Sequence, residues 1–181
     1  MSLIHNNNFK WFLVRDNFLS HQECETQIKY IDDNVKSDNF VWGSLHNCKN
    51  IITEDKNLLD KVWKFIKISN TLVYKYDISG IQDSSIKLYP YENFKEDSDR
   101  HSDFAAGDGK VVNTCTKLTS VIFLNDDFEG GGLDVRGSII EAKKGRIVIF
   151  PSFAAHKVLQ FSKKDRYTLI TFAEGNTFKW N

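Results

Sequence analysis

Apolar positions at helical spacing mark the first 80 residues of the chain. Ser20 and Glu23 have the three-residue separation of a capping box, which predicts that a helix begins at Ser20. The expected buried stripe of this helix consists of Cys24, Ile28, Ile31 and Val35. A second helix is predicted from about Asp55 to Tyr76. Its broad apolar face comprises Leu58, Leu59, Val62, Trp63, Ile66, Val73 and Tyr76.

The segments around these helices have a different pattern. Phe9 to Arg15, with its aromatic residues and valine, predicts an opening strand. Ser37 to Asn50 is polar and is interrupted by Gly43, so we expect a loop between the two helices.

After Gly80 the pattern changes to short β-rich segments separated by turns that contain Gly and Asp. The expected strands are Ser85–Tyr89, Thr116–Leu124, Leu133–Val135, Ser138–Glu141, Arg146–Phe150, Lys157–Phe161 and Tyr167–Ala173. Short strands at this regular spacing are typical of a sandwich or jelly roll. The sequence therefore predicts an α+β fold in a single domain over residues 1–181. Helices over about 17–78 would brace a β core over about 84–174.

Composition narrows the class of protein. The 181 residues are 41% hydrophobic, which is enough for a core, and 24 basic residues balance 24 acidic ones. This balance lacks the basic excess of a dedicated nucleic-acid binder, so we expect no nucleic-acid partner. The three cysteines include no CxxC pair, which favours reduced thiols. The sequence shows neither a signal-peptide pattern nor an apolar run of roughly 18 residues, so we expect a cytoplasmic protein without membrane attachment.

Three features in the β-rich half, formed by four side chains, are candidates for metal and anion chemistry. In an extended segment, His101 and Asp103 point the same way, so an imidazole and a carboxylate converge. His156 follows a buried-looking strand and the turn at Pro151, and Arg166 opens the next strand. Each feature alone has an ordinary structural explanation: a solvated turn, a structural histidine, or an arginine that reaches solvent.

Together the three features indicate one kind of site. Two histidines and a carboxylate form the facial triad of non-haem Fe(II) oxygenases, which leaves positions for a 2-oxo acid and O2. The distant carboxylate of that acid requires a cation, and the planar fork of Arg166 suits it. The sequence therefore predicts iron ligands at His101, Asp103 and His156.

From about Phe9 to Ala173 the chain resembles the prolyl 4-hydroxylase-like branch of the 2-oxoglutarate/Fe(II) dioxygenases. The motifs that carry the resemblance are Lys87–Pro90, Arg100–Asp103, Leu118–Asn125, Gly130–Gly132, Gly145–Ser152, His156 and Arg166. The resemblance implies a double-stranded β-helix with iron at its open mouth. It also implies that Tyr89 and Thr168 contact 2-oxoglutarate, and that ascorbate serves as a reductant. The implied reaction is hydroxylation of a C–H bond in a peptidyl residue, most simply proline, with conversion of 2-oxoglutarate and O2 to succinate and CO2.

The chain departs from its relatives in ways that leave the substrate open. Some relatives carry a tyrosine where this chain has Phe123. The glycine-rich segment from Phe104 to Lys117 matches no substrate motif, although its position after the first ligands suits a loop that covers the substrate. Alternatives are the same chemistry on a free amino acid or another small metabolite, and a non-catalytic jelly roll that binds a metal or ligand. The retained Asp103 disfavours a halogenase.

Overall fold

The computed structural model describes residues 10–35, 40–43, 46–104 and 114–177. Its helices are α1 (His21–Asn34), α2 (Lys56–Ser69), a π-helical turn η2 (Asn70–Tyr74) and a 3-10 turn η3 (Tyr91–Asn93). The strands are β1 (Leu13–Arg15), β2 (Phe40–Gly43), β3 (His46–Ile52), β4 (Gly80–Tyr89), β5 (Thr114–Phe123), β6 (Glu129–Gly130), β7 (Leu133–Val135), β8 (Ser138–Ile140), β9 (Ile147–Pro151), β10 (His156–Val158), β11 (Phe161–Ser162) and β12 (Arg166–Asn176).

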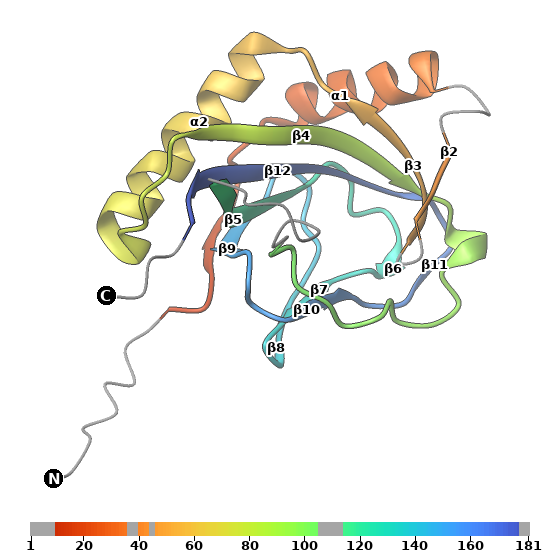
Figure 1. Ribbon diagram of the computed structural model, residues 1–181. Helices are drawn as coiled ribbons and strands as arrows, with labels where there is room; N and C mark the ends of the chain where they lie inside the picture. The colour runs from red at the N-terminus through yellow and green to blue at the C-terminus, as the bar shows by residue number, and fades with distance from the viewer. Residues whose placement is uncertain (1–9, 36–39, 44–45, 105–113, 178–181) are drawn as a thin grey trace, which may run out of the picture.

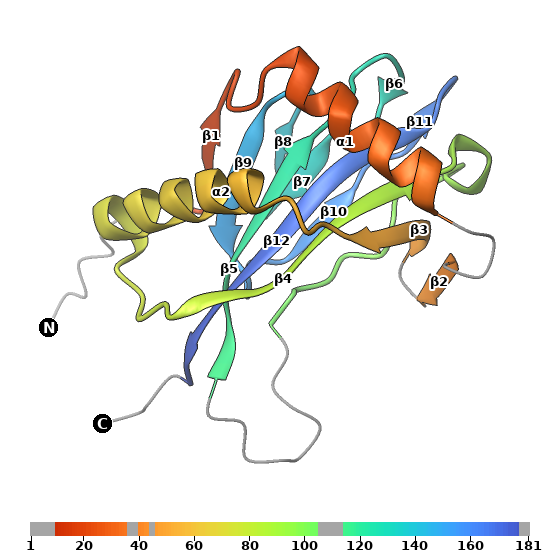
Figure 2. The same ribbon diagram turned by 90° about the horizontal axis from the view of Figure 1, so that it is seen from above.

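A large sheet with the strand order β1-β9-β5-β12-β4-β3-β2 forms the centre of the fold. Figures 1 and 2 show α1 and α2 lying across one face of this sheet. A three-stranded sheet, β10-β7-β8, lies on the other side of the large sheet, and β11 pairs with β6 beside it (Figure 1). The two β layers enclose the space in which the candidate site lies.

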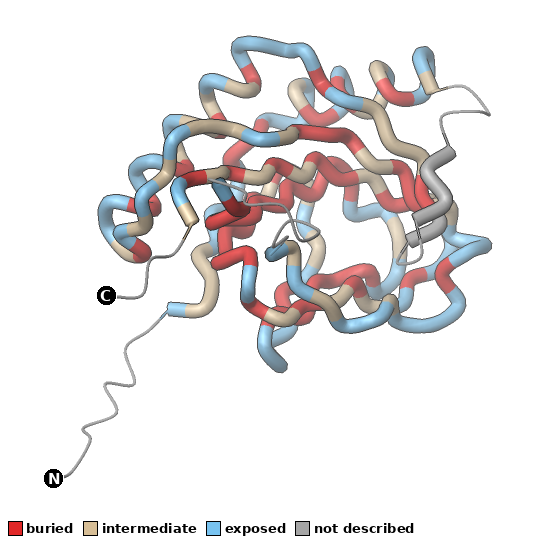
Figure 3. The backbone as a smooth tube through the Cα atoms, viewed as in Figure 1, coloured by how far each residue is buried: buried red, intermediate tan, exposed pale blue. Residues whose placement is uncertain are grey.

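Alternation along the strands separates two cores. β5 and β12 are antiparallel, and their register sets Ile122 opposite Leu169. The even-numbered residues of β5 and the odd-numbered residues of β12 therefore share one face of the sheet. Ile122 and Leu169 face α1 and α2, whereas Val121 and Phe123 face the smaller sheet. Figure 3 shows that buried residues concentrate along the strands of the large sheet. The helices therefore brace one face of the sheet and leave the other face for the site.

Both predicted helix starts are confirmed. The backbone N–H of Ser20 donates to Glu23 Oε2 at 2.7 Å, and the N–H of Glu23 donates to Ser20 Oγ at 3.2 Å. Asp55 caps α2, since its Oδ1 accepts from the N–H of Leu58 at 3.1 Å. The second helix continues beyond α2 as the π-helical turn and ends at Lys75, which has a left-handed φ of 57°.

The expected loop from Ser37 to Asn50 is wrong over the whole of its described length. Residues 40–43 form β2 and residues 46–52 form β3, and β3 pairs with β4 from Lys49↔Leu88 to Ile52↔Ser85. β3 pairs with β4, and the edge strand β2 (Phe-Val-Trp-Gly) pairs in turn with β3, so backbone pairing extends the sheet through a segment that contains Gly43 and the polar residues of β3. Residues 37–39 and 44–45 lie outside the described part.

Smaller differences concern the ends of the predicted elements. Residues 10–12 are not in a strand, so the opening strand is limited to β1. The single strand expected from Lys157 to Phe161 is two strands, β10 and β11, which belong to different sheets. The three cysteines are buried free thiols, as expected. Within the described ranges, no helix has the length and apolar character needed to cross a membrane.

Candidate active site

His101, Asp103 and His156 converge in the structure. Each offers one ligand atom, and these three atoms all lie within 4.8 Å of one another. Asp103 Oδ1 is 3.7 Å from His101 Nε2, and Asp103 Oδ2 is 3.4 Å from His156 Nε2. The three side chains therefore form a convergent donor set.

Backbone pairing brings the two histidines together. The N–H of His101 donates to the carbonyl of His156 at 2.9 Å, and the N–H of His156 donates to the carbonyl of His101 at 2.8 Å. This antiparallel bridge joins the segment before Asp103 to the first residue of β10. Two residues opposed in this way carry their side chains on the same face.

Hydrogen bonds also fix the ring orientation of both histidines. Nδ1 of His101 lies 2.9 Å from the carbonyl of Asp99, and Nδ1 of His156 lies 3.0 Å from the carbonyl of Ala154. A carbonyl only accepts, so each Nδ1 carries the proton and each Nε2 presents its lone pair to the centre of the triad. Burial lowers the pKa of His156, which favours the neutral form that a metal requires.

Asp103 is held both at its backbone and at its carboxylate. The Asp103 N–H donates to the carbonyl of Ser152 at 2.8 Å, and Thr119 Oγ1 donates to Asp103 Oδ2 at 2.8 Å. Thr119 Oγ1 also lies 3.0 Å from Ser152 Oγ. β5 and the turn after β9 thus orient the carboxylate toward the histidines.

We predict that Thr119→Val weakens metal binding by roughly 10–100-fold, the usual cost of losing a hydrogen bond to a metal ligand. Valine keeps the shape of the buried side chain but cannot donate to Asp103. Anaerobic titration with Fe(II) measures the effect. Thr171→Val is the matched control, because Thr171 is buried on the opposite face of the sheet and its hydroxyl bonds to Ser84 rather than to Asp103. Equal Fe(II) affinity in both variants would show that the backbone alone positions Asp103.

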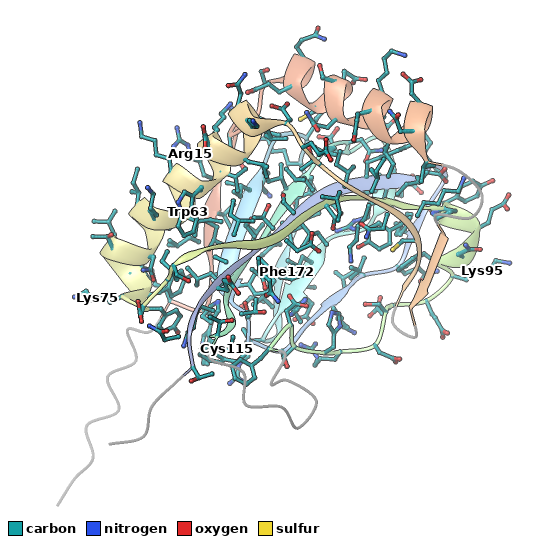
Figure 4. All side chains as sticks on the ribbon, turned by 45° about the horizontal axis from the view of Figure 1, so that its top comes forward. Arg15, Trp63, Lys75, Lys95, Cys115 and Phe172 are labelled. Atoms are coloured by element: carbon teal, nitrogen blue, oxygen red, sulfur yellow. The ribbon has the colours of Figure 1, made fainter. Side chains whose placement is uncertain are left out.

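The triad opens into a pocket between the two β layers. The other residues that line it are Lys87, Tyr89, Thr119, Val121, Leu133, Val158, Arg166, Ile170 and Phe172. Those from β4, β5 and β12 occupy alternate positions on the face turned away from the helices. Figure 4 labels Phe172 on β12, where this row of pocket residues ends.

Arg166 is the most deeply buried charged side chain of the pocket, with 1% of its surface exposed. Its Nε donates to the carbonyl of Gly131 at 2.9 Å, whereas Nη1 and Nη2 have no hydrogen-bond partner among the described residues. The guanidinium carbon lies 5.1 Å from the ring centroid of Tyr89 and 5.2 Å from that of Phe123. Burial lowers the pKa of Arg166, but guanidinium remains a cation at neutral pH. A buried cation with unused donors requires an anion.

The structure assigns places to the other residues considered from the sequence. Tyr89 lines the pocket, and Thr168 is fully buried beside it, with an Oγ1 that has no partner among the described residues. Arg146 lies outside the pocket, where its Nε donates to Asp16 Oδ1 at 2.6 Å. Most of the expected covering loop, residues 105–113, lies outside the described residues.

Sequence reasoning gave no role to Lys87, although it lines the same pocket. The signal was present, because Lys87 stands two residues before Tyr89 in a predicted strand and so shares its face.

Residues 86–174, about half of the chain, match the sequence model of the 2OG-Fe(II) oxygenase superfamily. The chain belongs to this superfamily. The matched segment begins within β4, ends within β12 and contains His101, Asp103, His156 and Arg166. No curated protein matches the sequence.

Solved structures of other oxygenases share the fold. The viral collagen prolyl hydroxylase vCPH from Paramecium Bursaria Chlorella virus-1 superposes with a TM-score of 0.70 at 17% identity, over 92% of this chain and 97% of that chain. A Pseudomonas putida prolyl-4-hydroxylase gives a TM-score of 0.70 at 14% identity, over 92% and 94%. A Trichoplax adhaerens prolyl hydroxylase, in complex with a hypoxia-inducible-factor peptide, gives 0.66 at 18% identity, over 90% and 83%. The predicted double-stranded β-helix is thereby confirmed.

Proposed function

We propose that this oxygenase uses Fe(II) held by His101, Asp103 and His156, and that Arg166 binds the distal carboxylate of 2-oxoglutarate. One observation carries the proposal: the convergent triad and a buried guanidinium with two unpartnered nitrogens line the same pocket. A metal site alone does not explain the buried cation, whereas a chelating dicarboxylate requires both.

The residues present fit this cofactor pair. Three protein ligands leave positions for a bidentate 2-oxo acid and O2, and a guanidinium fork matches a carboxylate. When bound, iron and 2-oxoglutarate supply the activation of O2, with release of succinate and CO2. The chain holds the ligands, orients the co-substrate and excludes water. Tyr89 and Thr168 are proposed as further contacts to 2-oxoglutarate, because both are buried beside Arg166.

The proposed reaction on the prime substrate is hydroxylation of an unactivated C–H bond in a peptidyl residue, most simply proline. Support comes from the fold neighbours, which are named as prolyl hydroxylases, one of them in complex with a peptide. Since fold does not fix substrate, a free amino acid or another small metabolite is the alternative.

Incubation with Fe(II), 2-oxoglutarate and ascorbate is expected to add one oxygen atom to a proline-rich peptide. Mass spectrometry of the peptide, and of free amino acids incubated separately, measures the gain, and the Asp103→Ala variant is the control. If only a free amino acid gains oxygen, the peptidyl assignment is wrong and the dioxygenase assignment stands. If succinate accumulates without an oxidised product, neither substrate class is correct.

A further inference from the structure

The pocket contains a second cation that the proposed chemistry does not use. On β4, Lys87 and Tyr89 occupy alternate positions of one face, and β12 places Thr168 opposite Lys87 and Arg166 opposite Tyr89. The pair Lys87–Thr168 is therefore the next cross-strand pair on this face after Tyr89–Arg166. On the neighbouring strand, the same face continues to Val121 and Thr119, and Thr119 bonds to Asp103. This order places Lys87 between the Arg166 end of the pocket and the triad.

The backbone of Lys87 is paired with β3 and β12, but its side chain has no hydrogen bond or ion pair with another residue that the structure describes. Most lysines with a contact in this structure pair with surface acids, as Lys157 does with Asp97 and Lys164 with Asp127. The neighbouring Tyr89 has the largest effect in raising the pKa of Lys87, and Asp103 adds to it, so the amine stays charged at neutral pH. Asp83 is on the same face of β4 as Lys87, further along the strand, but it does not line the pocket.

Charge balance shows what this lysine lacks. In the loaded site, the charges of iron(II) and Arg166 equal those of the Asp103 carboxylate and the two carboxylates of 2-oxoglutarate. The positive charge of Lys87 is then in excess within a pocket that also contains Val121, Leu133, Val158, Ile170 and Phe172. A partly buried charge is costly unless it is paired, so one further anion is expected beside the triad.

We propose that Lys87 selects a prime substrate that carries a carboxylate near the C–H bond to be oxidised. This inference rests on the proposed function and specifies its substrate. The carboxylate could belong to a free acid or to an acidic residue next to the target residue of a peptide, and both present the same group to the ammonium. In either case the substrate anion, and not 2-oxoglutarate, neutralises Lys87.

Matched acid and amide pairs test this preference by binding alone. Calorimetry would use anaerobic protein loaded with Fe(II) and 2-oxoglutarate. One pair is N-acetylproline and its amide, and the other is the capped dipeptides Pro-Glu and Pro-Gln. We expect the acid of at least one pair to bind about tenfold or more tightly than its neutral partner. The pair that shows the preference identifies the source of the carboxylate. Equal or undetectable binding within both pairs would overturn the proposal.

Variants then assign the preference to Lys87. Lys87→Met and Lys87→Gln should abolish the difference between acid and amide, whereas Lys87→Arg should retain most of it. Lys164→Met, which removes a surface lysine outside the pocket, should leave the difference unchanged. A preference that survives in Lys87→Met overturns the proposal. The proposal is also overturned if a Lys87 variant keeps the acid preference but loses affinity for 2-oxoglutarate to the extent expected for Arg166→Ala. Lys87 would then bind the co-substrate and not the prime substrate. Failure of wild-type protein to bind Fe(II) or 2-oxoglutarate would instead refute the proposed function.

Discussion

Alanine in place of His101, Asp103 or His156 is expected to abolish Fe(II) binding at micromolar protein. Each residue supplies one of three convergent ligand atoms within 4.8 Å of one another, so its loss leaves an incomplete triad. The loss should exceed the roughly 10–100-fold caused by removing an outer hydrogen-bond partner. Wild-type protein with anaerobic Fe(II) and 2-oxoglutarate should show the weak visible charge-transfer band of a chelated 2-oxo acid, and the three variants should not.

The fold should survive these substitutions. The side chains of His101 and Asp103 remain 16% and 15% exposed at the pocket, away from the core between the helices and the large sheet. Circular dichroism would verify this, and His21→Ala on α1 is the matched control for loss of an imidazole. Absence of the band in wild-type protein at saturating Fe(II) and 2-oxoglutarate would refute the iron and co-substrate assignment.

Arg166→Ala is expected to weaken 2-oxoglutarate binding by at least about 100-fold while Fe(II) binding is largely kept. Removing one partner of a buried charge pair costs about 3–5 kcal/mol, which corresponds to this factor or more. The side chain is 1% exposed and its two terminal nitrogens have no other partner among the described residues, so little can replace it. Anaerobic titration of the charge-transfer band with 2-oxoglutarate measures the effect.

A co-substrate analogue makes this test specific. 2-Oxobutyrate retains the chelating group and lacks the distal carboxylate, so its affinity should change little between wild type and Arg166→Ala. Arg146→Ala is the control for loss of a guanidinium, because Arg146 pairs with Asp16 outside the pocket. If Arg166→Ala binds 2-oxoglutarate like wild type, another cation takes the distal carboxylate, and Lys87 is the one that lines the pocket with Arg166.

Local interactions explain which elements the sequence predicted. The capping box at Ser20 and Glu23 acts over three residues, and the apolar face of α2 repeats with the helical period, so both are visible in the sequence. The strands β5, β7, β8, β9 and β12 combine β-branched residues with turn signals and were found for the same reason. The order of His101, Asp103, His156 and Arg166 indicated the chemistry, because each residue type has a distinct role toward iron and a 2-oxo acid.

Long-range pairing decided the rest. β3 carries several polar residues and pairs with β4, more than thirty residues later in the chain, and β2 pairs in turn with β3. The tautomers of His101 and His156 depend on the carbonyls of Asp99 and Ala154, which the fold brings into position. The charge environment of Lys87 depends on three strands from different parts of the chain, β4, β5 and β12, whose register no local pattern specifies. The sequence by itself therefore determined which chemical groups the site contains. Only the tertiary structure decided which of them are buried together and which of their charges lack a partner.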